Sequence, residues 1–358
     1  MPAIHQLVAG FSRGDAISNE ALVMRRLFRA WGFAAEIFCE RRRILVELRD
    51  EARDVEEAPA RCRPEDVVLL HLSIGSRANE IFPHLPGRKV LLYHNITPPE
   101  YFRWVNAQTA RELARGREQA QALAGVAQIN LADSRFNATE LEAMGYRSVA
   151  VLPLLLDFAR LKAAPDRRVL RACADGLVNV LFVGRVAPNK RLEDVLAAFA
   201  CFQKAVVPAS RLILAGSFAG TERYQRLLLS MARDLRLSNV LFAGSVPQAE
   251  LNAYYRGAHV LLCMSEHEGF CIPLLEAMWH QVPVMAYAAA AVPETLDGAG
   301  VLFREKAMEL IAEMMARVAA PGALRSAILA GQQARLERFL RQDPEVELRR
   351  HLAALLPA

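Results

Sequence analysis

The sequence lacks the features of several protein classes. Its 358 residues contain no apolar run that reaches the roughly 18 uncharged residues of a membrane-spanning helix, since the most apolar windows, Val67–Ile74 and Val282–Val292, are short or interrupted by His71 and Pro283. The first residues lead directly into a strand-like segment, Ile4–Ala9, without the basic region or cleavage site of an export signal. We therefore expect a cytoplasmic protein.

Cysteine and charge also show little pattern. The six cysteines form no Cys-x-x-Cys pair and have no histidine at metal-ligand spacing, so we interpret them as reduced thiols in the core. The net charge of +5, from 44 basic and 39 acidic residues, is too small to predict nucleic-acid binding. A basic face resting on anionic lipid of an inner membrane stays open as a peripheral contact.

What is present is a regular alternation of short apolar runs with helix-length amphipathic segments. A composition that is 53% hydrophobic and 23% charged excludes intrinsic disorder, and the length suggests about two domains at roughly 150 residues each. Continuous apolar strands joined by helices indicate parallel sheets that are covered on both faces. The sequence therefore predicts an α/β protein with two doubly wound, Rossmann-like domains that face a central cleft.

The expected elements can be given by residue range. Strands are expected at Ile4–Ala9, Ala34–Phe38, Val67–His71, Lys89–Tyr93, Gln128–Ala132, Ser148–Val151, Val178–Val183, Arg211–Ala215, Val240–Ala243, His259–Cys263, Val284–Ala286 and Val301–Phe303. Helices are expected at Ser18–Trp31, Ser76–Phe82, Pro98–Leu123, Phe136–Met144, Leu192–Ala205, Tyr224–Leu235, Gln248–Tyr255, Pro273–Trp279, Lys306–Ala319 and Gln332–Leu356.

The pattern breaks near Pro153–Gly176, which we interpret as a linker because it is rich in proline and charge. We place an N-terminal domain at residues 1–160 and a C-terminal domain at residues 161–335. Residues 336–358 are expected to form a C-terminal helix that can pack back on the N-terminal domain.

Two loops at strand ends have residue types suited to a diphosphate. After the strand Val178–Val183, Gly184 permits a sharp turn, and Arg185 and Lys190 can hold negative charge beside a helix N-terminus. A strand–loop–helix corner with solvated charges is the alternative interpretation.

The second loop combines two carboxylates with a helix start. Gly269 and Phe270 offer backbone N–H groups just before Pro273, a residue suited to the first helical turn. Glu268 lies on the loop, while Glu276 lies early in the helix. Compensation of the helix dipole would explain Glu276 alone, but not this whole arrangement. We therefore favour a binding site here.

These motifs resemble the large retaining GT-B glycosyltransferase family that includes sucrose synthases and bacterial mannosyltransferases. The resemblance extends over about Val178 to Val301. It rests on Glu268-x7-Glu276 with Gly269-Phe270 and Pro273, on Gly184-Arg185 followed by Asn189-Lys190, and on Phe242-Ala243-Gly244-Ser245-Val246 followed by Tyr254.

The resemblance implies a role for each matching residue. Arg185 and Lys190 would bind the donor diphosphate and stabilise it as the leaving group, and both count as catalytic. Glu268, also catalytic, would contact the transferred sugar, and Glu276 would accept hydrogen bonds from the ribose. The remaining expected donor contacts come from Gly184, from the nucleobase loop Gly244, Ser245 and Val246, and from backbone groups of Gly269, Phe270, Cys271 and Ile272. The family commonly has another glycine where Cys271 stands.

The first half matches the family more loosely, and the resemblance implies that residues 1–160 form the acceptor-binding domain and residues 161–335 the donor-binding domain. Gly14, in a glycine-containing loop after the first strand, could approach a donor phosphate, and Ser12 and Asp15 beside it are expected to bind the acceptor; an ordinary strand–helix turn is the alternative. His94 in Tyr93–Pro99 is expected to act catalytically by contacting the donor sugar, although a lone histidine at a strand end is more often structural. Ser134 is either an acceptor-pocket residue or a helix cap.

No metal is expected. Glu266-His267-Glu268 could suggest a metal site, but no Asp-x-Asp occurs in the chain, and Arg185 and Lys190 already provide cations for the diphosphate. The resemblance likewise implies metal-free stabilisation of the leaving group, and we expect no cofactor beyond the nucleotide sugar substrate.

The function expected from the resemblance is retaining transfer of a hexose from a nucleotide diphosphate sugar to a hydroxyl group. A GDP-sugar such as GDP-mannose, or a related deoxyhexose donor, is favoured over UDP- and dTDP-sugars because Tyr93–Pro99 resembles bacterial mannosyl- and rhamnosyltransferases. The expected acceptor is a glycan or a polyprenyl-diphosphate-linked sugar of bacterial surface polysaccharide synthesis, such as that of lipopolysaccharide. A GT-B sugar-nucleotide epimerase and a non-catalytic nucleotide-sugar-binding subunit are the alternatives.

Overall fold

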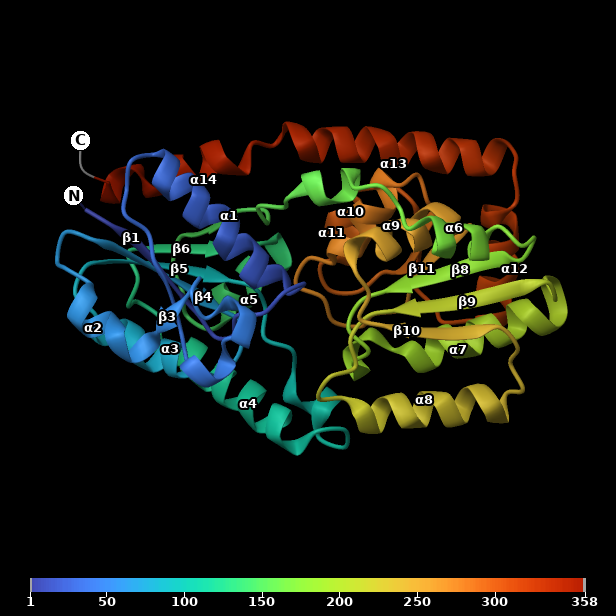
Figure 1. The fold of residues 1–358 in the computed structure, drawn as a ribbon, viewed down its shortest axis with the longest axis horizontal. Coiled ribbons are helices and arrows are strands. Elements are labelled where there is room, and N and C mark those ends of the chain that lie inside the picture. The colour runs from blue at the N-terminus through green and yellow to red at the C-terminus, as the bar shows by residue number, and fades with distance from the viewer. Residues whose placement is uncertain (1, 357–358) are drawn as a thin grey trace. The chain divides into compact units, whose positions relative to one another are not determined.

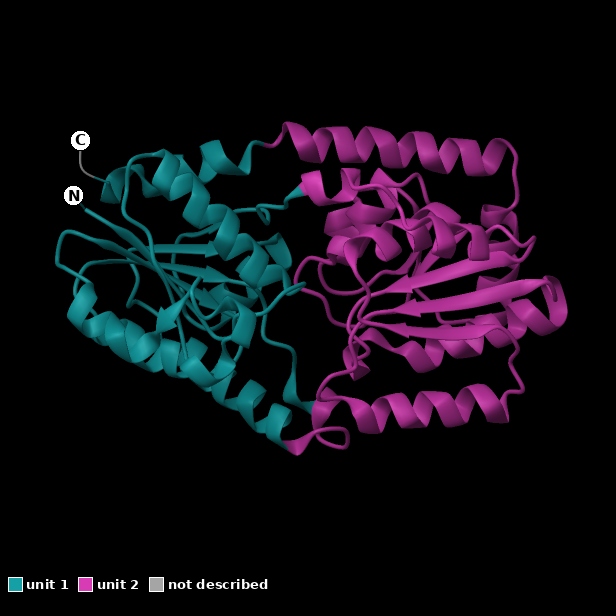
Figure 2. Cartoon of the chain, in the orientation of Figure 1, with its two compact units in different colours: residues 1–100, 108–157, 343–358 teal, residues 101–107, 158–342 magenta. Residues whose placement is uncertain are grey.

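The computed structural model describes residues 2–356 and divides into two compact units, each built from separate stretches of the chain (Figure 2). Unit 1 comprises residues 1–100, 108–157 and 343–358, and unit 2 comprises residues 101–107 and 158–342. The units thus change at residues 157/158 and 342/343, in place of the expected boundaries at 160/161 and 335/336. Residues 357–358 of the expected C-terminal helix lie outside the described residues.

Unit 1 contains a seven-stranded parallel sheet in the order β3-β2-β1-β4-β5-β6-β7. Its strands are β1 (Ile4–Val8), β2 (Ile37–Cys39), β3 (Arg53–Asp54), β4 (Val67–Leu72), β5 (Arg88–Tyr93), β6 (Ile129–Ala132) and β7 (Val149–Val151). Its helices are α1 (Ala16–Ala30), α2 (Ala58–Arg61), α3 (Arg77–Ile81), α4 (Ala107–Ala122), α5 (Arg135–Ala143) and α14 (Pro344–Leu352).

The strands of unit 1 are continuous apolar runs because both faces of the sheet are covered. All residues of β1 and β4 are buried. Figure 1 shows α1 and α14 on one face of this sheet, where Met24, Phe28 and Leu352 pack with Leu69 and Leu92 in one core. Helix α14 is therefore part of the hydrophobic core of unit 1, although it follows unit 2 in the sequence.

Unit 2 contains a six-stranded parallel sheet in the order β10-β9-β8-β11-β12-β13. Its strands are β8 (Val178–Val183), β9 (Ser210–Ala215), β10 (Val240–Gly244), β11 (Val260–Cys263), β12 (Val284–Tyr287) and β13 (Val301–Phe303). Its helices are α6 (Arg167–Cys173), α7 (Leu192–Cys201), α8 (Glu222–Asp234), α9 (Gln248–Gly257), α10 (Ile272–Trp279), α11 (Val292–Leu296), α12 (Met308–Ala319) and α13 (Ala323–Arg341).

Helices cover both faces of the second sheet as well. In Figure 1, α7 and α8 lie on one face, while α6 and α9 lie on the other. A single core joins Leu196 and Phe199 of α7, Leu228 of α8 and Met315 of α12 to inward-facing strand residues such as Leu212. The predicted α/β class with two doubly wound parallel sheets is therefore confirmed.

Two expected helices have different bounds in the structure, and the expected linker, which does contain the boundary between the units at residues 157/158, includes a helix that was not predicted. The helix expected over Pro98–Leu123 starts only at Ala107, and residues 99–102 form a 3-10 turn, since two prolines there remove backbone donors. The expected linker Pro153–Gly176 contains a helix, α6, capped by the Asp166 side chain.

The single helix expected over Gln332–Leu356 is two helices. α13 begins at Ala323 and ends at Arg341, and α14 begins at Pro344. Asp343 starts the second of these helices, because its Oδ1 accepts hydrogen bonds from the N–H groups of Glu345 and Val346.

The strand order locates the place where each sheet can bind a ligand. In doubly wound sheets, ligands bind beyond the carboxyl ends of the strands where the order reverses. That reversal lies between β1 and β4 in unit 1 and between β8 and β11 in unit 2. The loops that follow these four strands contain Gly14, Lys190 and Glu268.

Candidate functional site

Two residues predicted to bind the donor are in direct contact in unit 2. Lys190 ends the short 3-10 turn after β8, and Glu268 lies on the loop after β11. The Nζ of Lys190 donates a hydrogen bond to Oε2 of Glu268, and the two side chains are 20% and 8% exposed. The fold therefore places an ammonium and a carboxylate together at the strand reversal.

Asn189 joins the two loops that carry this pair. Its side chain is 6% exposed, and its Nδ2 donates to the carbonyl of His267 at 3.0 Å. Its own carbonyl accepts from the N–H of Glu266 at 2.9 Å. These two hydrogen bonds fix the position of Lys190 relative to Glu268, a role for Asn189 that the sequence pattern did not reveal.

The charge of Lys190 is secured by its partner. Burial by itself lowers the pKa of Lys190, but the carboxylate of Glu268 beside it outweighs burial, so the pKa lies above its ordinary value. Lys190 is therefore an ammonium at neutral pH. A protonated amine held in a mostly buried position can bind an anion strongly, because little water competes for it.

Glycines shape the loops beside this pair. Gly184 (φ +146°), Gly216 (φ +155°) and Gly244 (φ +69°) follow or end the neighbouring strands β8, β9 and β10. A Cβ on Gly216 would lie 1.8 Å from the carbonyl oxygen of Gly184, so the backbones approach too closely for any side chain. The sequence analysis identified Gly184 and Gly244 but missed Gly216, although it also follows directly on an apolar strand.

Arg185 lies on the exposed rim of the same loop. Its Nη2 donates to the carbonyl of Ala219 at 3.1 Å, and its guanidinium lies 6.0 Å from the ring centre of Phe102. These contacts come from the loop after β9 and from the short segment 101–107. These contacts orient Arg185 but leave it exposed, whereas Lys190 is mostly buried.

Glu276 is buried in α10 and has two partners. It is 4% exposed; Arg160 Nη2 donates to its Oε1, and the hydroxyl of Tyr255 donates to its Oε2 at 2.7 Å. Arg160 belongs to the segment interpreted as a linker, so the sequence analysis missed it. The arrangement leaves an oriented carboxylate that still has lone pairs for further donors.

The start of α10 contains the remaining predicted donor contacts. Gly269 and Ile272 are half-buried. The rings of Phe270 and Phe339 pack together, with their centroids 5.9 Å apart. Cys271 has a left-handed backbone (φ +72°, ψ +62°) immediately before the helix. In the nucleobase loop after β10, Ser245 is exposed and Val246 half-buried.

In unit 1, His94 belongs to a chain of buried polar groups. Its side chain is 2% exposed, its Nε2 lies 2.9 Å from Nδ1 of His71, and Nε2 of His71 lies 2.9 Å from Oε1 of Gln6. The other nitrogen of His94, Nδ1, lies 3.5 Å from Asp133 Oδ2 and 3.6 Å from Glu20 Oε2. The sequence analysis identified only His94 in this network.

The network determines which nitrogens carry protons. Gln6 Nε2 donates to the Ala21 carbonyl at 3.0 Å, so Gln6 presents its oxygen to His71, whose Nε2 must donate. Burial, and then the charge of His94, hold the pKa of His71 well below its usual range. A neutral His71 accepts at Nδ1, so Nε2 of His94 carries a proton and its Nδ1 faces the two carboxylates.

Burial and the neighbouring charges shift the pKa values of His94 and Glu20 in the same direction. Burial opposes charge on His94, but Asp133 and Glu20 outweigh it and raise its pKa above the ordinary value. Burial raises the pKa of Glu20 to about 7, against the opposing effect of His94. Both shifts favour the protonated forms in the folded protein.

Because both pKa values are raised by folding, we expect stability to fall as the pH rises. The unfolded Glu20 loses its proton near its ordinary pKa of 4.5, whereas the folded one retains it to about 7, so this contribution is complete below pH 4.5 and is lost as pH rises through 7. Glu20→Gln should flatten the decrease in unfolding midpoint between pH 5 and 7.5, as measured by thermal denaturation. Glu118→Gln, at an exposed position of α4, is the control; an unchanged slope in Glu20→Gln would contradict the assignment.

The other predicted residues of unit 1 have local structural contacts. Gly14 is exposed with φ +76°. Asp15 caps α1, since its Oδ2 accepts from the N–H of Ser18 at 2.8 Å, and the N–H of Ser12 donates to Ser18 Oγ at 3.0 Å. Ser134 caps α5 by accepting from the N–H of Asn137 at 3.2 Å. Their roles toward an acceptor stay predictions.

Two groups of side chains among the described residues could hold a metal ion. One is Glu20, His71 and His94, and the other is Cys263, Glu268 and Cys271; within each group the ligand atoms lie within 4.8 Å of one another. Glu266, considered in the sequence for a metal, is instead paired with Lys306 at 2.8 Å and Arg191 at 3.3 Å. The expectation of no metal stays a prediction.

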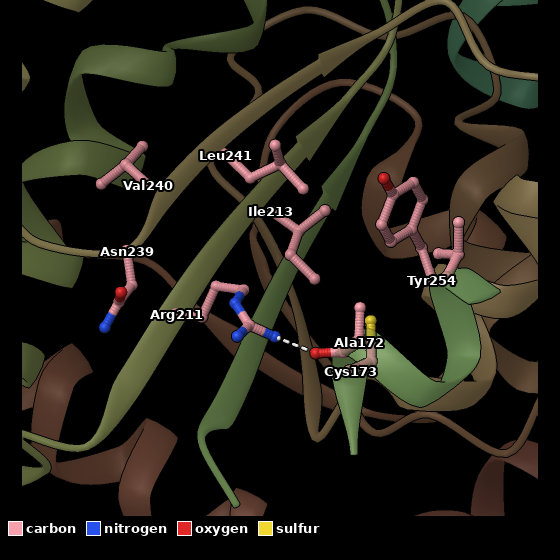
Figure 3. A pocket seen from close by; sticks show the side chains of 9 residues that line it. Ala172, Cys173, Arg211, Ile213, Asn239, Val240, Leu241 and Tyr254 are labelled. Carbon is pink, nitrogen blue, oxygen red and sulfur yellow. Dashed lines mark hydrogen bonds between the residues drawn. The ribbon is translucent and has the colours of Figure 1, made fainter. Parts of the chain in front are cut away.

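A cavity of about 320 Å³ lies elsewhere in unit 2 (Figure 3). It is lined by residues of β9, β10, α6 and α9, including Arg211, Leu241 and Tyr254. Arg211 is turned toward α6, where its Nη1 donates to the Ala172 carbonyl at 2.9 Å. No residue predicted to bind donor or acceptor lines this cavity, so it is not the predicted site.

A family model described as glycosyl transferases group 1 matches residues 174–351. This segment is a glycosyltransferase group 1 domain. The glycosyltransferase group 1 domain contains Lys190, Glu268 and Glu276, the glycines at the ends of β8 to β10, and the loops that position them.

Relatives of the glycosyltransferase group 1 domain have different names. O-antigen chain mannosyltransferase B from Escherichia coli is 30% identical over 122 residues, which cover 34% of this chain and 32% of that protein. D-inositol 3-phosphate glycosyltransferase from Acidothermus cellulolyticus is 31% identical over 184 residues, which cover 49% of this chain and 41% of that protein. The matches thus span a third to two fifths of the length of these relatives.

Solved structures are similar over nearly the whole chain. Sucrose-phosphate synthase from Thermosynechococcus elongatus has a TM-score of 0.75 at 16% identity, with 99% of both chains covered. HepE from Anabaena in complex with UDP-glucose has a TM-score of 0.74 at 15% identity, with 98% of both chains covered. The predicted GT-B fold is therefore confirmed. Among the described residues, no helix is long and apolar enough to cross a bilayer.

Proposed function

We propose that the chain is a retaining, metal-independent glycosyltransferase that moves a hexose from a nucleotide diphosphate sugar to a hydroxyl group. The observation that carries this proposal is the contact between Lys190 and Glu268 at the strand reversal of the glycosyltransferase group 1 domain. An ammonium there meets the charge of a diphosphate, and a carboxylate beside it meets sugar hydroxyls.

We propose that the charged side chains of this site bind the nucleotide sugar donor. The ammonium of Lys190 donates hydrogen bonds to the diphosphate, and Arg185 on the rim adds a second cation. As the bond to the sugar breaks, negative charge grows on the diphosphate, so both cations stabilise the transition state more than the bound donor. Glu276 accepts from the ribose hydroxyls while Tyr255 and Arg160 hold its orientation.

Unit 1 is proposed to contact the transferred sugar and the acceptor. His94 is the residue of unit 1 that we propose to contact the sugar, although its Nε2 lies against His71 and its Nδ1 faces Glu20 and Asp133. Gly14, Ser12, Asp15 and Ser134 remain the proposed acceptor-side residues.

The donor and acceptor are proposed more specifically from the Tyr93–Pro99 segment. We propose a GDP-sugar that carries mannose or a related deoxyhexose, and a glycan or polyprenyl-diphosphate-linked acceptor for bacterial surface polysaccharide at the cytoplasmic face of the inner membrane. The name of the Escherichia coli relative, an O-antigen mannosyltransferase, supports this choice. The UDP-glucose complex of HepE makes UDP-glucose the donor to test against it.

A thermal-shift experiment with nucleoside diphosphates tests donor binding. A ligand at about 100 times its Kd stabilises the folded state by about 2.7 kcal/mol, which raises the unfolding midpoint by several degrees in a chain of this size. We expect GDP to give the largest shift, UDP and dTDP smaller ones, and the shift to persist in excess EDTA. A larger shift with UDP would contradict the choice of donor, and no shift with any of the three would contradict the function.

Dependence on an acceptor separates the proposed function from the two alternatives. Release of nucleoside diphosphate from the donor should increase on addition of a membrane-glycolipid extract. An epimerase would convert the donor without any acceptor. A binding subunit would show the thermal shift with no turnover.

A further inference from the structure

Two buried thiols lie next to the proposed donor site. Cys263 ends β11, and Cys271 directly precedes α10. Their Sγ atoms are 4.0 Å apart, and the residues are 5% and 7% exposed. The carboxylate of Glu268, the partner of Lys190, lies within 4.8 Å of both sulfurs. The sequence analysis interpreted both cysteines as reduced core thiols, because the chain has no Cys-x-x-Cys pair and no histidine at metal-ligand spacing.

Cys271 has a backbone conformation that disfavours a side chain. Its φ of +72° and ψ of +62° are left-handed, which costs a residue with a Cβ about 1–2 kcal/mol relative to glycine. Glycine would fit this turn without strain. A cysteine at such a position, in contact with a second cysteine, points to a use for the thiol itself.

We propose that Cys263 and Cys271 form a reversible disulfide when the protein meets a hydroperoxide, and that this bond disables the Lys190–Glu268 site. The thiolate of one cysteine attacks the peroxide O–O bond, giving a sulfenic acid and one molecule of water or alcohol. The second thiol attacks that sulfur and displaces water. In total the two thiols lose two protons and two electrons, which reduce the peroxide to one water and a second water or an alcohol. A thiol reductant reverses the bond.

Cys263 is suited to be the first nucleophile. Its Sγ lies 3.4 Å from Oγ of Ser265 as well as 4.0 Å from the other thiol. The hydroxyl of Ser265 can turn to donate a hydrogen bond to a thiolate at this sulfur, so we assign Cys263 the first step and Cys271 the second.

The bond would move the groups that bind the donor. A disulfide holds its sulfurs about 2.05 Å apart, so the 4.0 Å separation must close by about half. The end of β11 and the start of α10 flank the loop that carries Glu268, so any part of this closure that side-chain rotation does not supply displaces the loop. A displacement of about 1 Å in a catalytic group can cost about 100-fold in rate.

Mass spectrometry of the whole chain tests the bond without reference to activity. The reduced protein is treated with hydrogen peroxide, free thiols are blocked, and the digest is searched without reduction for a peptide that joins residues 263 and 271. We expect this cross-link, with loss of two hydrogens, and its disappearance after dithiothreitol. Cys263→Ala should not form it, while Cys173→Ala, which removes another buried thiol of unit 2, should form it as the unmodified chain does.

That the disulfide disables the Lys190–Glu268 site rests on the proposed function, and it is tested by a separate measurement. The thermal shift by nucleoside diphosphate should be lost on oxidation, return with dithiothreitol, and resist peroxide in Cys263→Ala. If the reduced protein gives no shift with any nucleotide, the proposed function fails while the cross-link can still form. If the cross-link forms and the shift persists, the disabling effect is wrong. If no cross-link forms, or micromolar zinc protects both thiols in its place, the redox proposal is overturned in favour of inert thiols or a metal site.

Discussion

Lys190→Met is expected to weaken the binding of nucleoside diphosphate by roughly 10- to 100-fold and to lower the rate of sugar transfer by about 1000-fold. A charge-assisted hydrogen bond contributes about 1.5–3 kcal/mol to binding, and loss of a group that stabilises developing charge costs about 10²–10³ in rate. Isothermal calorimetry with the diphosphate and a nucleotide-release assay measure the two effects.

The controls for this variant address stability. Removing the ammonium leaves the Glu268 carboxylate buried without its partner, which itself destabilises the fold. Lys190→Met combined with Glu268→Gln removes that charge, so a loss of binding in the double variant reports on Lys190 and not on unfolding. Lys306→Met breaks an ion pair of similar burial with Asp194 and Glu266 and should bind the diphosphate normally. If Lys190→Met and the double variant both bound the diphosphate with near-normal affinity, the assignment of this site would be wrong.

Gly216→Ala is expected to lower the free energy of unfolding by about 3–5 kcal/mol, in the range of the most damaging substitutions. The added Cβ would lie 1.8 Å from the Gly184 carbonyl oxygen, and both partners are backbone, so the ends of β8 and β9 must separate. The loop that carries Lys190 starts at this point, so nucleotide binding should weaken too. Urea denaturation at pH 7 measures the change.

Gly331→Ala is the matched control for that substitution. Gly331 lies in α13 of the same unit, a Cβ added there would meet no heavy atom within 4 Å, and its φ is not positive. Alanine should therefore stabilise the helix by up to about 1 kcal/mol. A Gly216→Ala protein with near-normal stability would show that the strand ends can separate without cost.

The elements and the position of the donor loops could be predicted because they depend on local patterns. Continuous apolar runs required strands buried on both faces, and Gly184 and Pro273 marked the turns that follow two of them. The predicted helix bounds were wrong where a capping side chain determines the residue at which a helix begins. Asp343 caps the start of a separate helix, α14, which the amphipathic pattern over residues 332–356 did not indicate.

Other site residues were missed because their neighbours come from distant parts of the chain. Arg160 lies in a segment without periodic pattern, and only folding brings it to Glu276. Glu20 looked like an ordinary residue of an amphipathic helix, yet it is 1% exposed and faces His94. No local signal distinguishes such a carboxylate from a solvated one.

The order of residues alone was sufficient for the α/β class, for two parallel sheets, and for the candidate donor residues, since periodicity and turn chemistry act over a few neighbouring positions. Tertiary structure decided which of these residues meet. It paired Lys190 with Glu268, placed Cys271 against Cys263, and buried His94 among His71, Glu20 and Asp133. These contacts depend on the strand order, which brings β8 beside β11 and β1 beside β4, and strand order is set by the packing of whole helices on the sheets.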